Sequence, residues 1–319
     1  MACRGAVMAA LADLAPDDLV LVACSGGTDS LSLVAATAWA AERLSLRAGA
    51  VCVDHGLQAG SPQVAARAAE ACRRLGLDPV EVVPVEVPAD SPDGPEAAAR
   101  LVRYAALATC ADRLGAVAVL LGHTSDDQAE QVLLGLVRGS GIRSLAGIPP
   151  RRGEVRRPFL EISRAQTHAS CDELGLVPWQ DPHNDDPAYL RVRVRRALID
   201  LTTDLGPGVR AGLVRTAALA RQDADYLDAL AADARRALGD LPWEVGDLIR
   251  LDPALRTRVW RAALTDAGVP AGALGRNHIA ECERLLTAWA GQGPIPLPGG
   301  YAVTRRSGQV SVSGPHTVN

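Results

Sequence analysis

A glycine-containing loop with hydroxyl side chains directly follows the first apolar run of the chain. The loop Ser25-Gly26-Gly27-Thr28-Asp29-Ser30 comes after residues 19–24 and opens a stretch with helical periodicity. Glycines let successive backbone N–H groups face one anion, hydroxyls add donors, and a helix N-terminus favours negative charge. We interpret the loop as a pyrophosphate site. The alternative is a capped turn, in which Asp29 and Ser30 only satisfy the amides of the first helical turn.

All 33 basic residues of the 319-residue chain are arginines. A Walker-type phosphate loop, a Schiff-base enzyme and a protein kinase each need a lysine at the reacting centre. The composition therefore excludes these three classes. A loop that binds phosphate in this chain has to use backbone and hydroxyl donors, with arginine as its cation.

Carboxylates gather after a later apolar run, in Gly122-His123-Thr124-Ser125-Asp126-Asp127 and at Glu130. If a helix begins near Asp126, then Asp126 and Glu130 share one face, and Asp127 points elsewhere. Carboxylate oxygens are ligands that Mg²⁺ prefers, so the group is a candidate site for Mg²⁺ beside a triphosphate. The alternative is an acidic helix start that the helix dipole stabilises.

Arginine is concentrated in the middle of the chain. Residues 138–196 hold 11 arginines against 7 acidic residues, although the whole chain has a net charge of −4. The asymmetry indicates an acidic body with an anion-binding strip, and a solvated arginine-rich surface is the alternative. Because guanidinium groups make bidentate contacts to phosphate, we favour Arg100, Arg138 and Arg195 as substrate or phosphate contacts.

Short apolar runs alternate with helical patterns through the first half of the chain. This alternation predicts an α/β fold with a parallel sheet that is covered on both faces. Ligands bind such sheets beyond the carboxyl ends of the strands, which is where the loop at Ser25, Asp54-His55-Gly56 and Gly122-His123 fall. The predicted strands are 19–24, 48–53, 80–87 and 117–121, and the predicted helices are 30–43, 61–75, 94–114 and 126–138.

The length predicts two domains at about 150 residues each. We expect a parallel-sheet domain over residues 1–205 and a smaller, mainly helical domain over residues 206–319, joined at Gly206-Pro207-Gly208. Residues 149–186 are expected to be less regular. Residues 295–312 contain short alternating runs and predict a hairpin or three-strand appendage. Helices are expected at 189–203, 207–238, 253–267 and 277–290.

The seven cysteines contain no C-x-x-C pair and fall within apolar patterns. This spacing favours buried free thiols over a metal or disulfide framework. No apolar run approaches the ~18 residues that cross a bilayer. The first twelve residues reach an acidic residue too early for a signal peptide, so we expect a soluble, cytoplasmic protein without a membrane partner.

The combined motifs resemble the pyrophosphate-loop (PP-loop) ATPases, whose S-G-G-x-D-S signature binds ATP that is cleaved between its α- and β-phosphates. Further stretches narrow the resemblance to the tRNA(Ile)-lysidine synthase family, in family order from about residue 19 to 195. The sequence departs from the family pattern at Thr124, Gln131, His183 and Val192. The matching stretches are Val53-Asp54-His55-Gly56-Leu57, Glu96-Ala97-Ala98-Ala99-Arg100 with Arg103-Tyr104, Gly122-His123-Thr124-Ser125-Asp126-Asp127-Gln128-Ala129-Glu130, Arg138-Gly139-Ser140-Gly141, Arg157-Pro158-Phe159-Leu160 and Asp181-Pro182-His183-Asn184 with Arg191 and Arg195.

The resemblance implies an adenine nucleotide α-hydrolase-like, ATP-binding catalytic domain over residues 1–205 and a tRNA- or substrate-binding role for the helical domain over residues 206–319. The implied enzyme is a ligase that attaches lysine to C2 of the wobble cytidine of isoleucine tRNA with a CAU anticodon. ATP would adenylate the cytidine with Mg²⁺ present, and AMP and pyrophosphate would leave. The implied partners are that tRNA and free lysine, and a homodimer is left open. Two alternatives are a PP-loop tRNA thiolase, disfavoured because that chemistry commonly uses paired cysteines, and a nucleotide-binding regulator without catalysis.

The residues and the resemblance together give a candidate site in three groups. The catalytic candidates combine acidic and cationic side chains: Asp29, Asp127, Arg100, Arg138 and Arg195. The nucleotide-binding candidates follow the predicted strands: Ser25, Gly26, Gly27, Thr28, Asp29, Ser30, Asp54, His55, Gly56 and His123. The metal-binding candidates are the acidic residues Asp126, Asp127 and Glu130.

Overall fold

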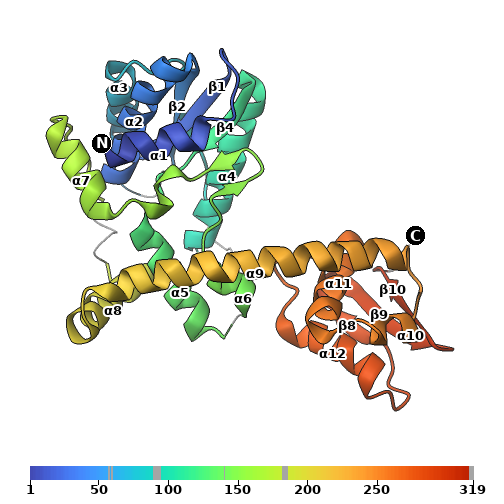
Figure 1. Ribbon diagram of the computed structural model, residues 1–319. Coiled ribbons are helices and arrows are strands. Elements are labelled where there is room, and N and C mark those ends of the chain that lie inside the picture. The colour runs from blue at the N-terminus through green and yellow to red at the C-terminus, as the bar shows by residue number, and fades with distance from the viewer. Residues whose placement is uncertain (57, 59, 89–94, 140, 182–185, 316–319) are drawn as a thin grey trace. The chain divides into compact units, whose positions relative to one another are not determined.

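The computed structural model describes the whole chain except residues 57, 59, 89–94, 140, 182–185 and 316–319. The chain forms two compact units, shown in Figure 1. Residues 1–139 and 144–217 make up the N-terminal unit, and residues 140–143 and 218–319 the C-terminal unit. The expected junction at Gly206-Pro207-Gly208 lies inside the N-terminal unit, between α8 (Leu190–Leu205) and α9 (Gly208–Leu238), and the boundary between the units falls within α9.

A six-stranded sheet in the order β3-β2-β1-β4-β6-β5 forms the centre of the N-terminal unit. Every neighbouring pair is parallel except β5 and β6, so the predicted parallel sheet is confirmed. The strands are β1 (Leu19–Ala23), β2 (Arg47–Asp54), β3 (Val80–Pro84), β4 (Ala116–Leu120), β5 (Arg151–Arg152) and β6 (Val155–Arg156).

The central strand β1 is buried on both faces, as its continuous apolar sequence requires. Val20 and Val22 pack into a core with α1, α2, α3 and α7, while Leu19 and Leu21 pack on the opposite face with α4. Helices therefore cover both faces of the sheet (Figure 1). Their bounds are α1 (Ala2–Leu11), α2 (Thr28–Leu44), α3 (Ser61–Arg74), α4 (Pro95–Leu114) and α7 (Arg164–Glu173).

The register brings the carboxyl ends of three strands to one edge. Ala23 of β1 pairs with Val51 of β2, and Val22 pairs with Leu120 of β4. Within the sheet, β2 pairs with one edge of β1 and β4 pairs with the other edge, so the strand order reverses at β1. This reversal of strand order is where open α/β sheets bind ligands. The loop after β1 and the loop after β4 border it.

A helical layer extends the N-terminal unit beyond the sheet. Ala129 and Leu134 of α5 (Ser125–Val137) form a small apolar core with Val194 and Leu198 of α8 (Leu190–Leu205). The start of α9 (Gly208–Leu238) joins this core. The remaining short helices are α6 (Ile142–Leu145) and the 3₁₀ helix η1 (Pro158–Glu161).

The expectation of an irregular stretch over residues 149–186 was wrong in part, because helix α7 lies within it. The Ser163 hydroxyl accepts a hydrogen bond from the Gln166 amide (3.3 Å), and the Ser163 amide donates to the Gln166 side chain (2.8 Å). Such a capping box is readable in a sequence as Ser-x-x-Gln. The polar composition of the helix hid it from a search for apolar periodicity.

The C-terminal unit contains a four-stranded antiparallel sheet in the order β7-β10-β9-β8. Trp243 and Trp260 lie at its core with ring centroids 6.0 Å apart. The short strands predicted within residues 295–312 are present. The elements are β7 (Trp243–Glu244), α10 (Val245–Ile249), α11 (Pro253–Asp266), α12 (Arg276–Thr287), β8 (Ile295–Leu297), η3 (Pro298–Gly300), β9 (Tyr301–Arg306) and β10 (Gln309–Ser313).

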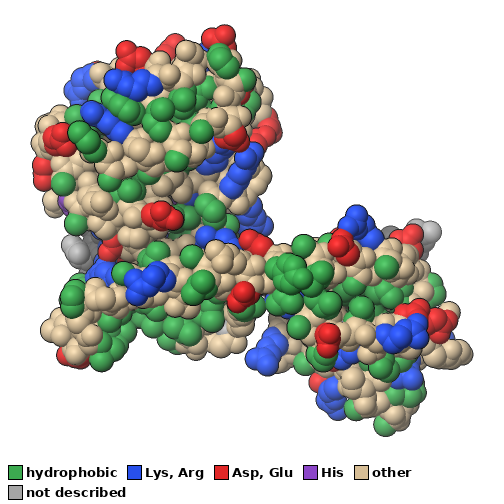
Figure 2. All heavy atoms as spheres, in the orientation of Figure 1, with side chains coloured by type: hydrophobic (Ala, Val, Ile, Leu, Met, Phe, Trp, Pro, Cys, Tyr) green, Lys and Arg blue, Asp and Glu red, His purple; other side chains and the backbone are tan. Residues whose placement is uncertain are grey.

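Surface charge is mixed on the face that Figure 2 shows, where Arg side chains are interspersed with Asp and Glu. The visible face contains no single broad basic patch. Among the described residues, no helix has both the length and the apolar character needed to span a membrane.

Candidate active site

The loop after β1 is a tight turn that its own hydroxyl groups hold in place. The Ser30 hydroxyl donates a hydrogen bond to the Gly27 carbonyl (2.8 Å), and the Ser25 and Ser30 hydroxyls lie 3.3 Å apart. Helix α2 begins at Thr28, with Gly27 in an extended conformation before it. The first amides of α2 have no partner within the helix, so the loop presents donors to an anion.

Gly26 is required both by its backbone conformation and by its surroundings. Its φ of 82° lies in the left-handed region, which is costly for other residues. A Cβ atom at this position would stand 3.3 Å from the Cβ of Ala68 on α3. The Gly26 carbonyl also accepts a hydrogen bond from the Trp179 amide (2.9 Å). The loop is thus clamped between α3 and the segment around Trp179.

A Gly26→Ala variant is expected to weaken ATP binding about tenfold or more, because the added methyl group displaces the loop against Ala68; tenfold corresponds to about 1.4 kcal/mol. Gly76→Ala is the matched control, since Gly76 has a φ of 88° and open space around it. Both variants should lose about 1–2 kcal/mol of stability from the left-handed backbone. Calorimetric titration with ATP checks the prediction, and equal affinities of the two variants would contradict it.

A cavity of about 920 Å³ opens at the edge of the sheet where β1, β2 and β4 end. Its wall includes the loop of residues 25–30, called the PP-loop below, the ends of the three strands and parts of α7 and α8. Of the candidate residues, those that line it are Ser25, Gly27, Thr28, Asp29, Ser30, Asp54, His55, His123, Asp127 and Arg195. Arg103, Arg164, Trp179, Tyr189 and Arg191 line it as well.

The end of β2 contributes Asp54 and His55 to the cavity wall. The Asp54 carboxylate accepts a hydrogen bond from the Gly56 amide (3.0 Å), which shapes the turn. Burial, together with the charge of Arg103, lowers the pKa of His55 below its usual value. The Nδ1 atom of His55 is buried without a hydrogen-bond partner among the described residues. A buried polar atom of this kind is costly unless a ligand or water satisfies it.

The end of β4 brings His123 close to the start of α2. Gly122 passes so near that an added Cβ would stand 3.1 Å from the Asp29 carbonyl oxygen. Burial lowers the pKa of His123 to about 3, and Arg157 and Arg103 add to this effect against the opposing charge of Asp127. His123 is therefore a neutral ring at physiological pH, and its Nδ1 atom has no partner among the described residues.

The ring resonances of His123 are expected to stay unchanged between about pH 5 and pH 8. Its folded-state pKa lies far below the usual value of 6.5, so the folded protein takes up no proton there in this range. Proton NMR of the histidine rings measures the effect, with His123→Gln used to assign the signal. A titration step for that signal near pH 6 would show that the ring is not held neutral.

Thr124 and Asp127 fix the start of α5 by a reciprocal cap. The Asp127 carboxylate accepts from the Thr124 amide (2.7 Å) and hydroxyl (2.9 Å), and the Thr124 hydroxyl accepts from the Asp127 amide (3.4 Å). Thr124, one of the departures from the family pattern, is fully buried here. Its hydroxyl holds one Asp127 oxygen and leaves the other free to face Arg164.

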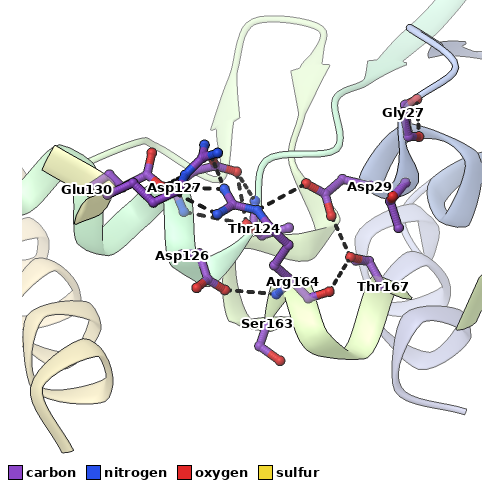
Figure 3. Close-up of polar contacts among 12 residues, drawn as sticks. Gly27, Asp29, Thr124, Asp126, Asp127, Glu130, Ser163, Arg164 and Thr167 are labelled. Atoms are coloured by element: carbon purple, nitrogen blue, oxygen red, sulfur yellow. Dashed lines mark hydrogen bonds and ion pairs between the residues drawn. The ribbon is translucent and has the colours of Figure 1, made fainter. Parts of the chain in front are cut away.

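The guanidinium group of Arg164 is the centre of the carboxylate cluster (Figure 3). It lies 3.0 Å from Asp127, 3.4 Å from Glu130 and 3.7 Å from Asp29. Burial works against the Asp127 carboxylate, but the charge of Arg164 and the Thr124 cap outweigh it and lower the pKa of Asp127. One cation from α7 therefore holds together acidic side chains from α2 and α5.

Two further arginines bind the outer carboxylates of α5. Arg210, at the start of α9, pairs with Asp126, which also accepts a hydrogen bond from the Arg164 backbone amide (2.8 Å). Arg195 of α8 donates to Glu130 over 3.0 Å, and the Glu130 side chain is almost fully buried. Asp126 and Glu130 lie outside the cavity wall, and these contacts anchor α7, α8 and α9 to α5.

Asp29 differs from Asp127 in its electrostatics. The Thr167 hydroxyl donates to one Asp29 oxygen, and Arg164 lies at the edge of hydrogen-bonding range. Burial raises the pKa of Asp29, and Thr167 and Arg164 only partly oppose it. The two acidic residues line one cavity, and the more weakly compensated of them belongs to the PP-loop.

Asp127 lines the cavity, whereas Asp126 and Glu130 lie outside its wall. All three nevertheless contact Arg164, which binds Asp126 through its backbone amide and the other two through its guanidinium group. Arg100 and Arg138 are exposed and do not line the cavity. Arg100 instead donates to the Tyr104 hydroxyl (3.1 Å). His183 lies outside the described residues.

Arg164, Thr167 and Arg210 were not predicted from the sequence, although they contact the candidate acidic residues. The Ser163-x-x-Gln166 box is a signal that would have placed Arg164 and Thr167 in the first turn of a helix. Arg210 has no comparable signal. It reaches Asp126 from 84 positions further along the chain, so only the fold reveals the contact.

Comparison with known proteins gives two family matches along the chain. Residues 6–202 match the PP-loop domain, and residues 244–310 match the TilS substrate binding domain. A tRNA(Ile)-lysidine synthase of Thermobifida fusca is 53% identical, covering 97% of this chain and 96% of the relative. Those of Salinispora tropica (98% and 96% covered) and Streptomyces coelicolor (92% and 85% covered) are 51% and 52% identical.

A solved structure with a similar fold is the U34-tRNA thiolase NcsA from Methanococcus maripaludis. Its TM-score is 0.56 with 19% sequence identity, and the match covers 69% of this chain and 78% of that chain. At this identity the likeness supports the fold alone, so it does not favour the thiolase alternative. The two matching domains and the relatives that match over nearly the full length give the assignment: this chain belongs to the tRNA(Ile)-lysidine synthase family.

Proposed function

We propose that the protein ligates lysine to C2 of the wobble cytidine in the CAU anticodon of isoleucine tRNA, which changes decoding from AUG to AUA. Its family consists of ligases that form a carbon–nitrogen bond. One observation carries the proposal at the level of the site. The PP-loop, Asp29, Asp127 and Arg195 line a single cavity, large enough for a nucleotide, in a chain that carries both family domains.

ATP would bind with its phosphates at the first amides of α2. Ser25, Thr28 and Ser30 supply hydroxyl donors beside them, and the helix dipole favours the negative charge. The reaction joins the cytidine C2 oxygen to the α-phosphorus, and pyrophosphate leaves. The lysine side-chain amine then attacks C2 and AMP departs with that oxygen. Placing the reactants in one cavity itself lowers the barrier.

Asp29 and Asp127 are the residues that fit Mg²⁺ best, because carboxylates from both line the cavity. The Arg164 guanidinium lies close to both carboxylates, so Mg²⁺ would share them with this arginine. When bound, Mg²⁺ would neutralise the triphosphate. Asp126 and Glu130 have the weaker claim as ligands, because Arg210 and Arg195 hold them outside the cavity wall. Their predicted metal role stays a prediction.

Cations and neutral donors on the remaining wall would serve the transferred group. Arg195 and Arg191 of α8 face the cavity, and bidentate contacts from arginine suit the charge that develops at phosphorus. His123 stays neutral and so contributes no charge there. Arg100 and Arg138 are exposed, so we assign them to contacts with the tRNA backbone rather than to the reacting atoms.

The direct test mixes untagged protein, ATP, Mg²⁺, radiolabelled lysine and a transcript of isoleucine tRNA with a CAU anticodon. The control is initiator methionine tRNA, which carries the same anticodon. We expect label in the isoleucine tRNA and release of pyrophosphate that depends on it. Label in both tRNAs or in neither would refute specific lysidine synthesis, and pyrophosphate without tRNA dependence would indicate another PP-loop reaction.

We also propose that the enzyme works in the cytoplasm, where tRNA, ATP and free lysine occur together. A homodimer stays a prediction. Light scattering of the eluting protein tests it, and a mass near 33.3 kDa would identify a monomer instead.

A further inference from the structure

Three cysteines from separate elements meet directly beneath the PP-loop. Cys24 follows β1, Cys52 belongs to β2 and Cys72 to α3, and their sulfur atoms all lie within 4.8 Å of one another. All three side chains are buried and form no disulfide. Their spacing in the sequence, 28 and 20 residues apart, gives no sign of the cluster because only the fold assembles it.

The cysteine cluster adjoins the PP-loop at Cys24 and includes Cys72 of α3. Cys24 directly precedes Ser25, and its Sγ atom lies 3.7 Å from the Ser30 hydroxyl. Cys72 is one helical turn after Ala68, whose Cβ atom would stand 3.3 Å from a Cβ atom added at Gly26. Of the three cysteines, Cys24 lines the cavity, so the cluster borders the cavity at that residue.

The distances suit one soft metal ion. Zinc–sulfur bonds of about 2.3 Å place the sulfur atoms of a tetrahedral site about 3.8 Å apart. Inward shifts of a fraction of an ångström would bring these side chains to that spacing. Burial favours a divalent ion over a monovalent one, because three thiolates around it leave the smaller net charge. The fourth position would be open to the cavity, as in zinc sites that keep a bound water.

We propose that Cys24, Cys52 and Cys72 form a binding site for one thiophilic divalent ion of the zinc type. Each thiol that coordinates loses its proton to solvent, and three sulfur–metal bonds form. The ion ties β1, β2 and α3 together at the base of the PP-loop. It is thereby separate from the Mg²⁺ proposed at Asp29 and Asp127, whose oxygen ligands suit a hard ion.

The test titrates reduced, untagged protein with Zn²⁺ in competition with a chromophoric chelator, and in parallel with Cd²⁺, whose sulfur bonds absorb in the ultraviolet. We expect one equivalent of each ion and none of Mg²⁺ at the sulfur site. Cys72→Ala should lower the affinity by at least about a hundredfold, a loss at the upper end for changes around metal sites. Cys282→Ala, which removes a buried thiol of the C-terminal unit, is the matched control and should bind as wild type.

Wild-type protein that binds Zn²⁺ no more tightly than Cys72→Ala would overturn the proposal. If circular dichroism shows that the variant does not fold, X-ray absorption at the zinc edge of the wild-type complex decides instead. Three sulfur ligands support the site, and a shell of nitrogen and oxygen alone contradicts it. Neither measurement depends on lysidine formation, so both stand whether or not the proposed function holds.

Discussion

An Asp127→Asn variant is expected to lose lysidine formation by about a hundred- to a thousandfold while keeping its fold. The range is that of removing one preorganised electrostatic group from an active site. Asparagine has the same shape and its carbonyl oxygen can still accept from the Thr124 amide, so the cap of α5 is retained. The lost quantity is the negative charge that faces Arg164 and the cavity. Incorporation of labelled lysine under single-turnover conditions measures the effect.

Asp112→Asn is the control for this variant, because Asp112 is an exposed residue of α4 outside the cavity wall. It should retain the wild-type rate. Asp29→Asn should show a loss comparable to that of Asp127→Asn, since both carboxylates line the cavity. If both asparagine variants keep near-normal rates, the two acidic residues are not part of the catalytic centre, and the assignment of this cavity fails.

The sheet could be predicted because its signal is local. The central strand β1 is a short, continuous apolar run that is buried on both faces, and β1, β2 and β4 are each followed by a polar turn. Helix α7 was missed for the opposite reason: it is polar, and only Thr167 and Cys171 are buried in it. Apolar periodicity detects helices with an apolar face, whereas the sequence signal of α7 is the capping box at its start.

The location of the candidate site could be predicted from the sequence, but the ion pairs between its residues could not. Residues that follow β1, β2 and β4 meet at one edge because parallel strands bring their carboxyl ends together. The arginine partners of the acidic residues come from α7, α8 and α9. The order of the strands does not determine where these helices lie. Of the three arginines predicted as phosphate contacts, Arg195 lines the cavity, whereas Arg100 and Arg138 do not. Composition cannot tell which arginine side chain points inward.

An Arg164→Met variant is expected to lose about 3–5 kcal/mol of stability, the cost of removing one partner from a buried ion pair. Methionine replaces most of the packing volume but leaves the carboxylates of Asp127 and Glu130 without their shared cation. Arg143→Met is the matched control, because Arg143 also bridges two carboxylates but is half exposed. That control should lose at most about 1 kcal/mol. Chemical denaturation measures both differences.

Low pH and Mg²⁺ should each reduce the loss of folding stability that Arg164→Met causes. In the wild type the pKa of Asp127 is lowered, so its stabilising contribution is present above about pH 4 and is lost as the pH falls through that lowered value. Without the guanidinium, burial raises the pKa of Asp127, and protonation then favours the folded variant. The difference in stability between variant and wild type should therefore narrow between pH 7 and pH 5.

Mg²⁺ should stabilise the variant more than the wild type, because in the variant it no longer competes with Arg164 for Asp29 and Asp127. A gap that is constant with pH and Mg²⁺ would mean that Arg164 stabilises the fold by packing rather than by its charge.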